Sequence, residues 1–207
     1  MGDANLDRIY EASGSAEMRE LYDKWAEKYD ADVEGSGYET PRRIAETLAE
    51  LVPDKDTPLL DYGCGTGLSG VALAAQGFST IDGCDLSEKM LHRARERECY
   101  RNLELIEPGQ SLPKSIADYE VVAAVGVISK GAAPPSVYGE VLHMMKPGAI
   151  LIFSLNDLSL AEPEYASLAE ESAKAGQVEI VSSVHGPHLT GYEDNSGSTV
   201  TVVRKLG

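Results

Sequence analysis

The sequence predicts an α/β protein with a doubly wound, mostly parallel sheet and an antiparallel last strand. Three observations lead to this fold class. Short apolar runs alternate with helical patterns from about Leu59 onward, which is typical of strands joined by crossover helices. The strongest run, Tyr119 to Val127, is nearly continuous in valine and alanine, as expected for a central strand covered on both faces. The last two predicted strands have no helix between them, so they should pair antiparallel.

Two helices are expected ahead of the sheet. Met18, Leu21, Tyr22, Trp25 and Tyr29 recur at helical spacing. A second helix begins at Thr40-Pro41, and Pro53 ends it. We expect one domain over residues 1–207, with N-terminal helices and a candidate lid in 1–53 and an α/β core in 57–207.

The core elements follow in order. Seven strands are predicted: Leu59–Tyr62, Ser79–Cys84, Leu103–Ile106, Tyr119–Val127, Ala149–Ser154, Val178–Val184 and Ser198–Arg204. Helical patterns begin at Leu68, after Ser87, at Pro134-Pro135 and at Pro163, and the last of them should end at Gly176. The first strand therefore leads through a glycine-rich loop into a helix, and the second ends at Asp85.

Composition bounds the function classes. The chain has 207 residues, 43% of them hydrophobic and 25% charged, which excludes a disordered or fibrous protein. Its net charge of −16 should repel phosphate backbones and anionic lipids, so we expect neither a nucleic-acid partner nor a membrane partner. The three cysteines lack zinc-cluster or disulfide spacing, which predicts no metal site and a reducing, cytoplasmic location. The sequence leaves the oligomeric state open.

The glycine loop and two carboxylates form the candidate site. Ligands of open parallel sheets bind at the carboxyl ends of the strands, where the loop and Asp85 both fall. Gly65-x-Gly67-x-x-Gly70 matches the dinucleotide fingerprint, and Asp85 lies 20 positions after Gly65, where a ribose-binding acid is expected. One reading is therefore an NAD-dependent oxidoreductase that uses these residues.

Asp61 favours another ligand. It ends the first strand two residues before Gly63 and is expected to face the same cleft. A carboxylate there repels a pyrophosphate but attracts an amino group. S-adenosyl-L-methionine (SAM) has an ammonium, a sulfonium and two ribose hydroxyls but no phosphate. Asp61 would then lie near the ammonium and Asp85 would accept from the ribose hydroxyls, with Leu86, Met90 and Ile106 available to flank the adenine.

Three motifs resemble class I SAM-dependent methyltransferases: Leu60-Asp61-Tyr62-Gly63-Cys64-Gly65-Thr66-Gly67, Asp85-Leu86-Ser87-Glu88-Lys89-Met90-Leu91 and Leu142-x-x-Met145-Lys146-Pro147-Gly148. Tyr22-Asp23-x-Trp25-Ala26-x-x-Tyr29-Asp30 and Val125-Gly126-Val127 look like the Williams-Beuren-region methyltransferase-like subgroup. The resemblance implies a Rossmann-like methyltransferase fold of seven strands, with SAM as cofactor and S-adenosyl-L-homocysteine (SAH) as product. The cofactor-binding residues it implies, together with the reasoning above, are Tyr22, Tyr29, Asp61, Gly63, Cys64, Gly65, Gly67, Asp85, Leu86, Met90, Glu107, Gly109 and Val125.

The chain departs from this family in two places. Many relatives have an acid after the third strand near the adenine amino group, and Glu107 stands one position early, so the Gly109 or Gln110 backbone is the alternative contact. The subgroup often has a histidine after the fourth strand, where this chain has Ser129-Lys130. The Asn-Pro-Pro-Tyr type motif of nucleic-acid amino methyltransferases is absent.

Methyl transfer from a sulfonium needs few catalytic side chains, because alignment of donor and acceptor does most of the work. We expect a small-molecule methyl acceptor. The candidate bases are His185 and His188, since they follow the sixth strand at the rim that carries the glycine loop. A non-catalytic binding protein of the same fold is a further alternative.

Overall fold

The computed structural model of the protein describes residues 20, 23, 37–106, 113–191 and 196–207. The helix expected around Met18 to Tyr29 therefore lies outside the described residues, apart from residues 20 and 23. The second N-terminal helix is present as α3, Thr40–Leu51, with Pro41 in its first turn.

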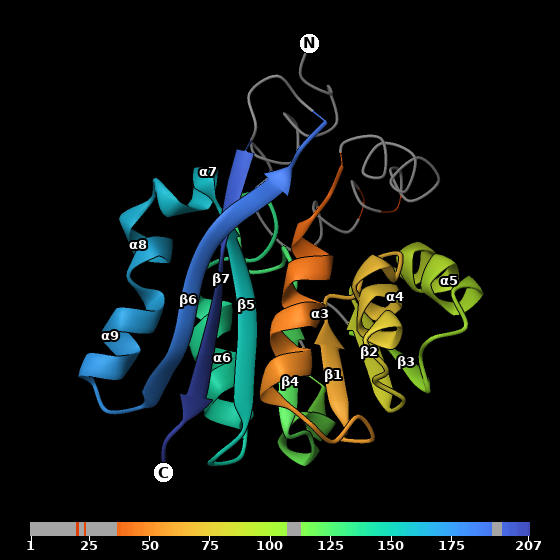
Figure 1. The fold of residues 1–207 in the computed structure, drawn as a ribbon, viewed down its shortest axis with the longest axis horizontal. Coiled ribbons are helices and arrows are strands. Elements are labelled where there is room, and N and C mark those ends of the chain that lie inside the picture. The colour runs from red at the N-terminus through yellow and green to blue at the C-terminus, as the bar shows by residue number, and fades with distance from the viewer. Residues whose placement is uncertain (1–19, 21–22, 24–36, 107–112, 192–195) are drawn as a thin grey trace.

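Seven strands form one sheet in the order β3-β2-β1-β4-β5-β7-β6 (Figure 1). Their bounds are Leu59–Tyr62 (β1), Ile81–Asp85 (β2), Asn102–Leu105 (β3), Val121–Ala124 (β4), Ile150–Asn156 (β5), Val178–Leu189 (β6) and Ser196–Lys205 (β7). Strands β1 to β5 pair in parallel, while β7 pairs antiparallel with both β5 and β6. The predicted fold class, including the antiparallel last strand, is confirmed.

Helices cover both faces of the sheet, and Figure 1 shows α3 in front of it and α6 behind. The elements after α3 are α4 (Leu68–Ala75), α5 (Glu88–Glu96), the 3-10 helix η1 (Lys114–Asp118), α6 (Ser136–Met144), α7 (Asp157–Leu160), α8 (Pro163–Ala166) and α9 (Leu168–Lys174). Helices α3 and α4 contribute to one buried cluster, and η1, α6 and α8 contribute to another. The sheet is thus the middle layer of three.

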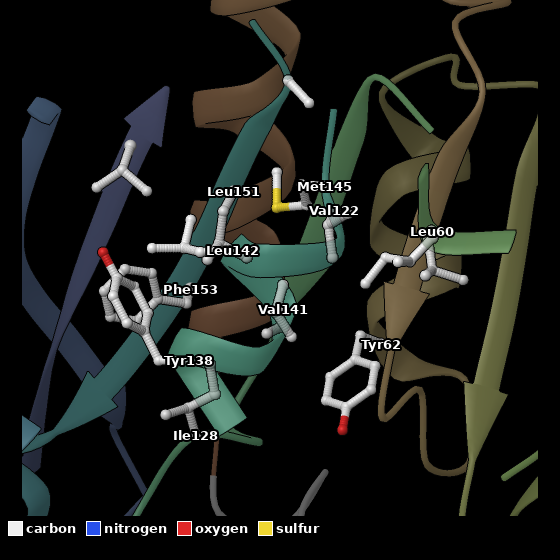
Figure 2. Close-up of a cluster of buried hydrophobic side chains, with 14 of the residues drawn as sticks. Leu60, Tyr62, Val122, Ile128, Tyr138, Val141, Leu142, Met145, Leu151 and Phe153 are labelled. Atoms are coloured by element: carbon white, nitrogen blue, oxygen red, sulfur yellow. The ribbon is translucent and has the colours of Figure 1, made fainter. Parts of the chain in front are cut away.

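Alternation along the strands creates the two cores. In β1, Leu59 belongs to the cluster under α3 while Leu60 belongs to the cluster under α6. Figure 2 shows the second cluster, in which Val141 and Leu142 of α6 meet Leu151 of β5. All of these side chains are buried, and burial of each stabilises the fold by about 1.5–3 kcal/mol.

The order in which the chain adds strands to the sheet reverses between the paired strands β1 and β4. The chain runs outward from β1 to β3, returns to β4 on the other side of β1, and then continues to β5. The connections therefore diverge above the carboxyl ends of β1 and β4, which is where open α/β sheets bind ligands. The loops that follow β1, β2 and β4 are consequently the ones that position a site.

The predicted bounds of most strands differ from the observed ones by one or two residues, and three predicted elements differ by more. Strand β4 ends at Ala124 rather than Val127, because Gly126 has a φ of 72° that an extended strand does not allow. Strand β6 continues to Leu189 rather than ending at Val184. The helix expected from Pro163 to Gly176 is divided into α8 and α9, and a further turn, α7, precedes it.

Candidate functional site

The glycine loop after β1 turns back on itself through left-handed backbone. Gly63, Gly65 and Gly67 have φ values of 69°, 54° and 90°, which residues with a Cβ rarely adopt. A Cβ on Gly63 would lie 2.5 Å from Val127 Cγ2, so the loop packs directly against the segment that follows β4. A Cβ on Gly65 would meet nothing within 4 Å. The crest of the loop is therefore open to close approach by a ligand.

Asp85, the last residue of β2, holds this crest. The Gly65 N–H donates to Asp85 Oδ2 at 3.0 Å, and the Ser87 N–H donates to Oδ1 at 2.9 Å. The structure thus joins the two ends of the 20-residue spacing seen in the sequence. Burial raises the pKa of Asp85 against the lowering effect of these backbone donors. A carboxylate has about four lone-pair positions, so Asp85 can also accept from ligand hydroxyls.

Asp61 lies beneath the loop rather than in an open cleft. Its side chain is fully buried, and Oδ2 accepts from the Ser69 hydroxyl at 2.6 Å and from the Tyr100 hydroxyl at 2.7 Å. Oδ1 is also buried and has no hydrogen-bond partner among the described residues. Burial raises the pKa of Asp61 to about 6, and the nearby Asp85 adds to this effect. A buried carboxylate oxygen without a donor is rare and calls for an explanation.

Tyr100 completes this site, although no sequence pattern pointed to it. It follows Asp61 by 39 residues and belongs to no motif. Its ring fills the space left by three glycines, because a Cβ on Gly67, Gly70 or Gly83 would lie 3.1, 2.3 or 2.9 Å from a Tyr100 ring atom. The second and third glycines of the fingerprint therefore admit a tyrosine from below.

The other predicted binding residues surround this loop at different depths. Cys64 is buried against α5, and its N–H donates to the Cys84 carbonyl oxygen at 3.0 Å. Met90 is buried in the first turn of α5, where Ser87 caps the helix by accepting from the Met90 N–H at 3.1 Å. Leu86 and Val125 are half-buried after β2 and β4. These four therefore lie on or beside the strands that carry the glycine loop and Asp85.

Part of the predicted site lies outside the described residues, namely Tyr22, Tyr29, Glu107 and Gly109. Asp23 is described and reaches the loop region, because its carboxylate accepts a hydrogen bond from the Ser87 hydroxyl. Asp23 therefore contacts the N-cap of α5.

The two candidate histidines lie within β6, not in a loop after it. Strand β6 continues past them because it is at the edge of the sheet, where Pro187 is tolerated at a bulge. His185 is 57% exposed, and its Nε2 lies 2.8 Å from Oδ1 of Asp157, the first residue of α7. The hydrogen bond from His185 lowers the pKa of Asp157.

His188 is held between β6 and α3. Its Nδ1 is 2.8 Å from Thr40 Oγ1, and burial lowers its pKa to about 4, so the ring is neutral near pH 7. Its ring packs at a right angle to the ring of Tyr38. The Tyr38 hydroxyl lies 2.9 Å from the position that a Cβ on Gly126, which follows β4, would occupy. Three strands separate β6 from β1, a distance of about 19 Å at the usual strand spacing. Tyr38 therefore connects the histidine side of the rim to the glycine-loop side.

The carboxylates and the open glycine loop of this site fit a cationic nucleoside cofactor such as SAM. The unpartnered Asp61 Oδ1 suits a donor that carries positive charge, and Asp85 suits hydroxyl groups. The open face of Gly65 allows a chain to pass against the backbone. Within the described ranges, no group of three or more His, Cys, Asp and Glu side chains could hold a metal ion. No helix in those ranges has the length and apolar character needed to cross a membrane.

Comparisons with known proteins agree with this geometry. Residues 53–195 match the family described as "Methyltransferase domain". Human methyltransferase-like protein 27 is 36% identical over 139 residues, which is 66% of this chain and 56% of the human protein. An 18S rRNA (guanine-N(7))-methyltransferase of Arabidopsis thaliana is 30% identical over 155 residues, 64% of this chain and 53% of that protein. The chain thus spans about half the length of these curated relatives.

Solved structures share the fold at low sequence identity. The [4+2]-cyclase SpnF aligns with a TM-score of 0.72 and 20% identity, covering 95% of this chain and 98% of the cyclase. A Haloferax volcanii protein in complex with the Trm112 methyltransferase activator aligns with a TM-score of 0.66 and 19% identity, covering 92% of this chain and 98% of that one. A cyclase among these neighbours shows that the fold alone does not define the reaction.

The exclusion of nucleic acid on the basis of net charge was wrong. Two relatives are named as 18S rRNA (guanine-N(7))-methyltransferases, one from Arabidopsis thaliana and one, a probable one by its name, from Dictyostelium discoideum. The net charge of a whole chain does not describe the local potential of one face, and an activator protein can add charges of its own. The family match covers more than half of the sequence and includes β1, the glycine loop and Asp85, so this chain belongs to the methyltransferase domain family.

Proposed function

We propose that the protein is a SAM-dependent methyltransferase that transfers a methyl group to a small-molecule acceptor and releases SAH. The observation that carries the proposal is the buried, unpartnered Oδ1 of Asp61 beneath the open crest of the glycine loop. An ionised oxygen without a donor is costly to bury, and an ammonium group would remove that cost.

Each part of the site has a separate role. Asp61 binds the ammonium, Asp85 accepts from the ribose hydroxyls, and the Gly65 backbone lets the methionyl chain pass. The sulfonium of SAM activates its own methyl group, so the chain's residues mainly align the acceptor and exclude water. The remaining predicted contacts, including Tyr22, Tyr29, Glu107 and Gly109, belong to this proposal.

The NAD-dependent alternative conflicts with the charge at the start of α4. A pyrophosphate binds the free N–H groups and positive dipole of a helix N-terminus. Asp61 already contacts Ser69, the second residue of α4, so a negative charge lies where the pyrophosphate would. Gly70, the third glycine of the fingerprint, donates its N–H to Tyr100 at 3.1 Å. Both features favour a ligand without phosphate.

Two bases are candidates for the acceptor side. His185 is exposed at the rim, and Asp157 orients its ring through Nε2. His188 is neutral near pH 7 and is connected through Tyr38 to the end of β4. We propose His185 as the base, because its ring is exposed at the rim and is oriented by Asp157. Replacement of His185 by Asn should then lower kcat for an acceptor that loses a proton when it is methylated, and it should leave SAH affinity unchanged.

Ligand-dependent melting tests the cofactor. At SAH concentrations 100 times the Kd, binding adds about 2.7 kcal/mol, which should raise the melting temperature by about 5–10 °C. NADH should produce no shift. Asp61→Asn and Asp85→Asn should each reduce the SAH shift, while Glu50→Gln, on the exposed face of α3, should not. Stabilisation by NADH alone would reject the proposal in favour of an oxidoreductase, and unchanged shifts in both site variants would show that SAH binds elsewhere.

An acceptor panel tests the reaction. SAH release is measured with small molecules that offer oxygen, nitrogen, sulfur or carbon acceptors and, in parallel, with ribosomal RNA. Turnover of a small molecule supports the proposal, and turnover of RNA alone replaces the acceptor class. SAH binding without turnover by any acceptor would favour a binding protein.

The free cysteines Cys64, Cys84 and Cys99 support our further proposal of a reducing cytoplasmic location.

A further inference from the structure

We propose that Tyr100 is a positioning residue that keeps Asp61 ionised and directs its free oxygen toward the cofactor's ammonium. The inference rests on the proposed function, since it assigns Asp61 to that group. Tyr100 belongs neither to the glycine loop nor to the two carboxylates, and it acts on the cofactor only through Asp61.

The hydrogen bonds of Tyr100 fix the direction of its only hydroxyl proton. The Gly70 N–H lies 3.1 Å from the hydroxyl oxygen, and a backbone N–H can only donate. The hydroxyl therefore accepts from Gly70 and must give its own proton to Asp61 Oδ2, which lies 2.7 Å away. Burial raises the pKa of Tyr100 well above its usual value, so the hydroxyl stays protonated as a donor.

The two donors lie on one oxygen of Asp61, which makes the carboxylate asymmetric. Ser69 and Tyr100 both donate to Oδ2, whereas Oδ1 lacks a donor among the described residues. Hydrogen bonds to the charged form stabilise it, so both donors oppose the effect of burial on the pKa of Asp61. The ligand therefore meets an oriented anion whose other oxygen is already occupied.

Other titratable groups face Asp61 without replacing this role. Asp85 at the end of β2 disfavours the Asp61 anion. Burial raises the pKa of Cys64 in the loop, Cys84 in β2 and Cys99 beside Tyr100, and Asp61 adds a smaller effect, so these thiols stay neutral. Across the described part of the chain, no Lys, Arg or His forms an ion pair with Asp61. The hydroxyls of Ser69 and Tyr100 are its described hydrogen-bond donors.

The test is the pH dependence of SAH affinity in Tyr100→Phe, measured by calorimetry between pH 5.5 and 8.5. Loss of one charge-assisted hydrogen bond should move the midpoint of the pH profile about one unit higher, so that binding weakens about two-fold at pH 7 and about eight-fold at pH 5.5. The variant should approach the wild type at the alkaline end, where Asp61 ionises without help. A loss that is merely structural would be equal at all pH values, and such a result, or no loss, overturns the inference.

Matched variants separate this outcome from a failure of the proposed function. Tyr119→Phe is the control, because Tyr119 donates to Asp82 Oδ2 at 2.8 Å in the neighbouring strand, away from the loop. Its SAH profile should not move. If Asp61→Asn binds SAH as tightly as the wild type, the cofactor assignment fails. If Asp61→Asn weakens binding but Tyr100→Phe leaves the midpoint in place, only the role of Tyr100 fails.

A second substitution keeps the test valid if Tyr100→Phe does not fold. Incorporation of 3,5-difluorotyrosine at position 100 keeps the ring and makes the hydroxyl a stronger donor. The midpoint of SAH binding should then move to lower pH, opposite to the effect of phenylalanine. An unchanged or higher midpoint would contradict the proposal.

Discussion

Asp61 carries a charge that folding disfavours. Burial raises its pKa from 3.8 to about 6, so the folded protein binds this proton more tightly than the unfolded chain does. The associated stability is present below pH 4 and is lost as the pH rises through 6. Asp61→Asn cannot ionise, so its free energy of unfolding relative to the wild type should increase by on the order of 2 kcal/mol between pH 4 and 7. Denaturant unfolding at several pH values checks this, and a difference that stays constant would contradict it.

The same proton should control ligand affinity in the wild type. Protonation removes the negative charge that attracts an ammonium, so SAH affinity should fall as the pH drops through about 6. Asp61→Asn should show weak binding with little dependence on pH in that range. A wild-type affinity that is constant from pH 5 to 8 would mean that Asp61 does not face the charged group.

Glycine substitutions distinguish the packing of the loop from general helix effects. Ala at Gly70 would place a Cβ 2.3 Å from the Tyr100 ring, which should cost about 1–3 kcal/mol and weaken SAH binding. Gly139 in α6 is the control, since a Cβ there meets nothing within 4 Å. Gly139→Ala should stabilise the protein by about 0.5–1 kcal/mol through helix propensity. Thermal melts with and without SAH measure both effects.

Among single residues, the sequence singled out candidates by their local spacing, and their roles in cofactor binding stay predictions. Gly65 and Asp85 were paired through a 20-residue interval, and the structure joins them by a hydrogen bond. Tyr100 was missed because its partners Gly67 and Gly70 at the start of α4 and Gly83 in β2 come from two separate segments. A contact of that kind has no periodicity or motif by which a single sequence could reveal it.

Among the elements, the end of β6 depends on one side chain of α3. Arg43 donates to the carbonyl oxygens of Val184, Pro187 and Ser198 at 2.8–3.0 Å. Arg43→Met keeps the aliphatic stem and removes these donors, so amides in residues 184–189 should exchange with solvent about ten-fold faster. Arg42→Met is the control, because Arg42 pairs with Glu39 and Glu46 on the exposed face. Equal exchange in both variants would show that β6 is held by β7 alone.

Element boundaries were predicted less well than element types. All seven strands and their directions followed from apolar runs and from the missing helix before β7. The end of β6 was missed because its last residues are polar and include Pro187, which only an edge strand accepts. Ser167 is the C-cap of α8 and the N-cap of α9, and its backbone is helical. No glycine or proline stands beside it, so the sequence did not indicate a break there.

For the whole molecule, the reversal of strand order between β1 and β4 predicts which backbone amides a bound ligand protects from exchange. SAH should slow amide exchange in residues 61–70 and 85–90, which contain the loop and the first turn of α5. Residues 178–184 of β6, four strands from β1, should show no change. Hydrogen exchange with mass spectrometry measures both regions. Protection confined to β6 would place the ligand at the other end of the sheet.

The net charge of −16 describes the chain as a whole and does not identify its acceptor. A negative net charge repels polyanions at long range, but screening reduces that effect beyond about 10 Å at 0.1 M salt. Recognition at a rim depends on the few side chains that line it. The fold class was therefore accessible from composition and pattern, while the acceptor was not.

One aromatic ring beneath three glycines restricts how this protein can change over evolutionary time. Position 100 cannot lose its ring without leaving a void, and positions 67, 70 and 83 cannot gain a methyl while that ring is present. Substitutions at these four sites should thus occur together or not at all. In an alignment of orthologues these four positions should covary, because they are separated along the chain but pack against one another in the fold.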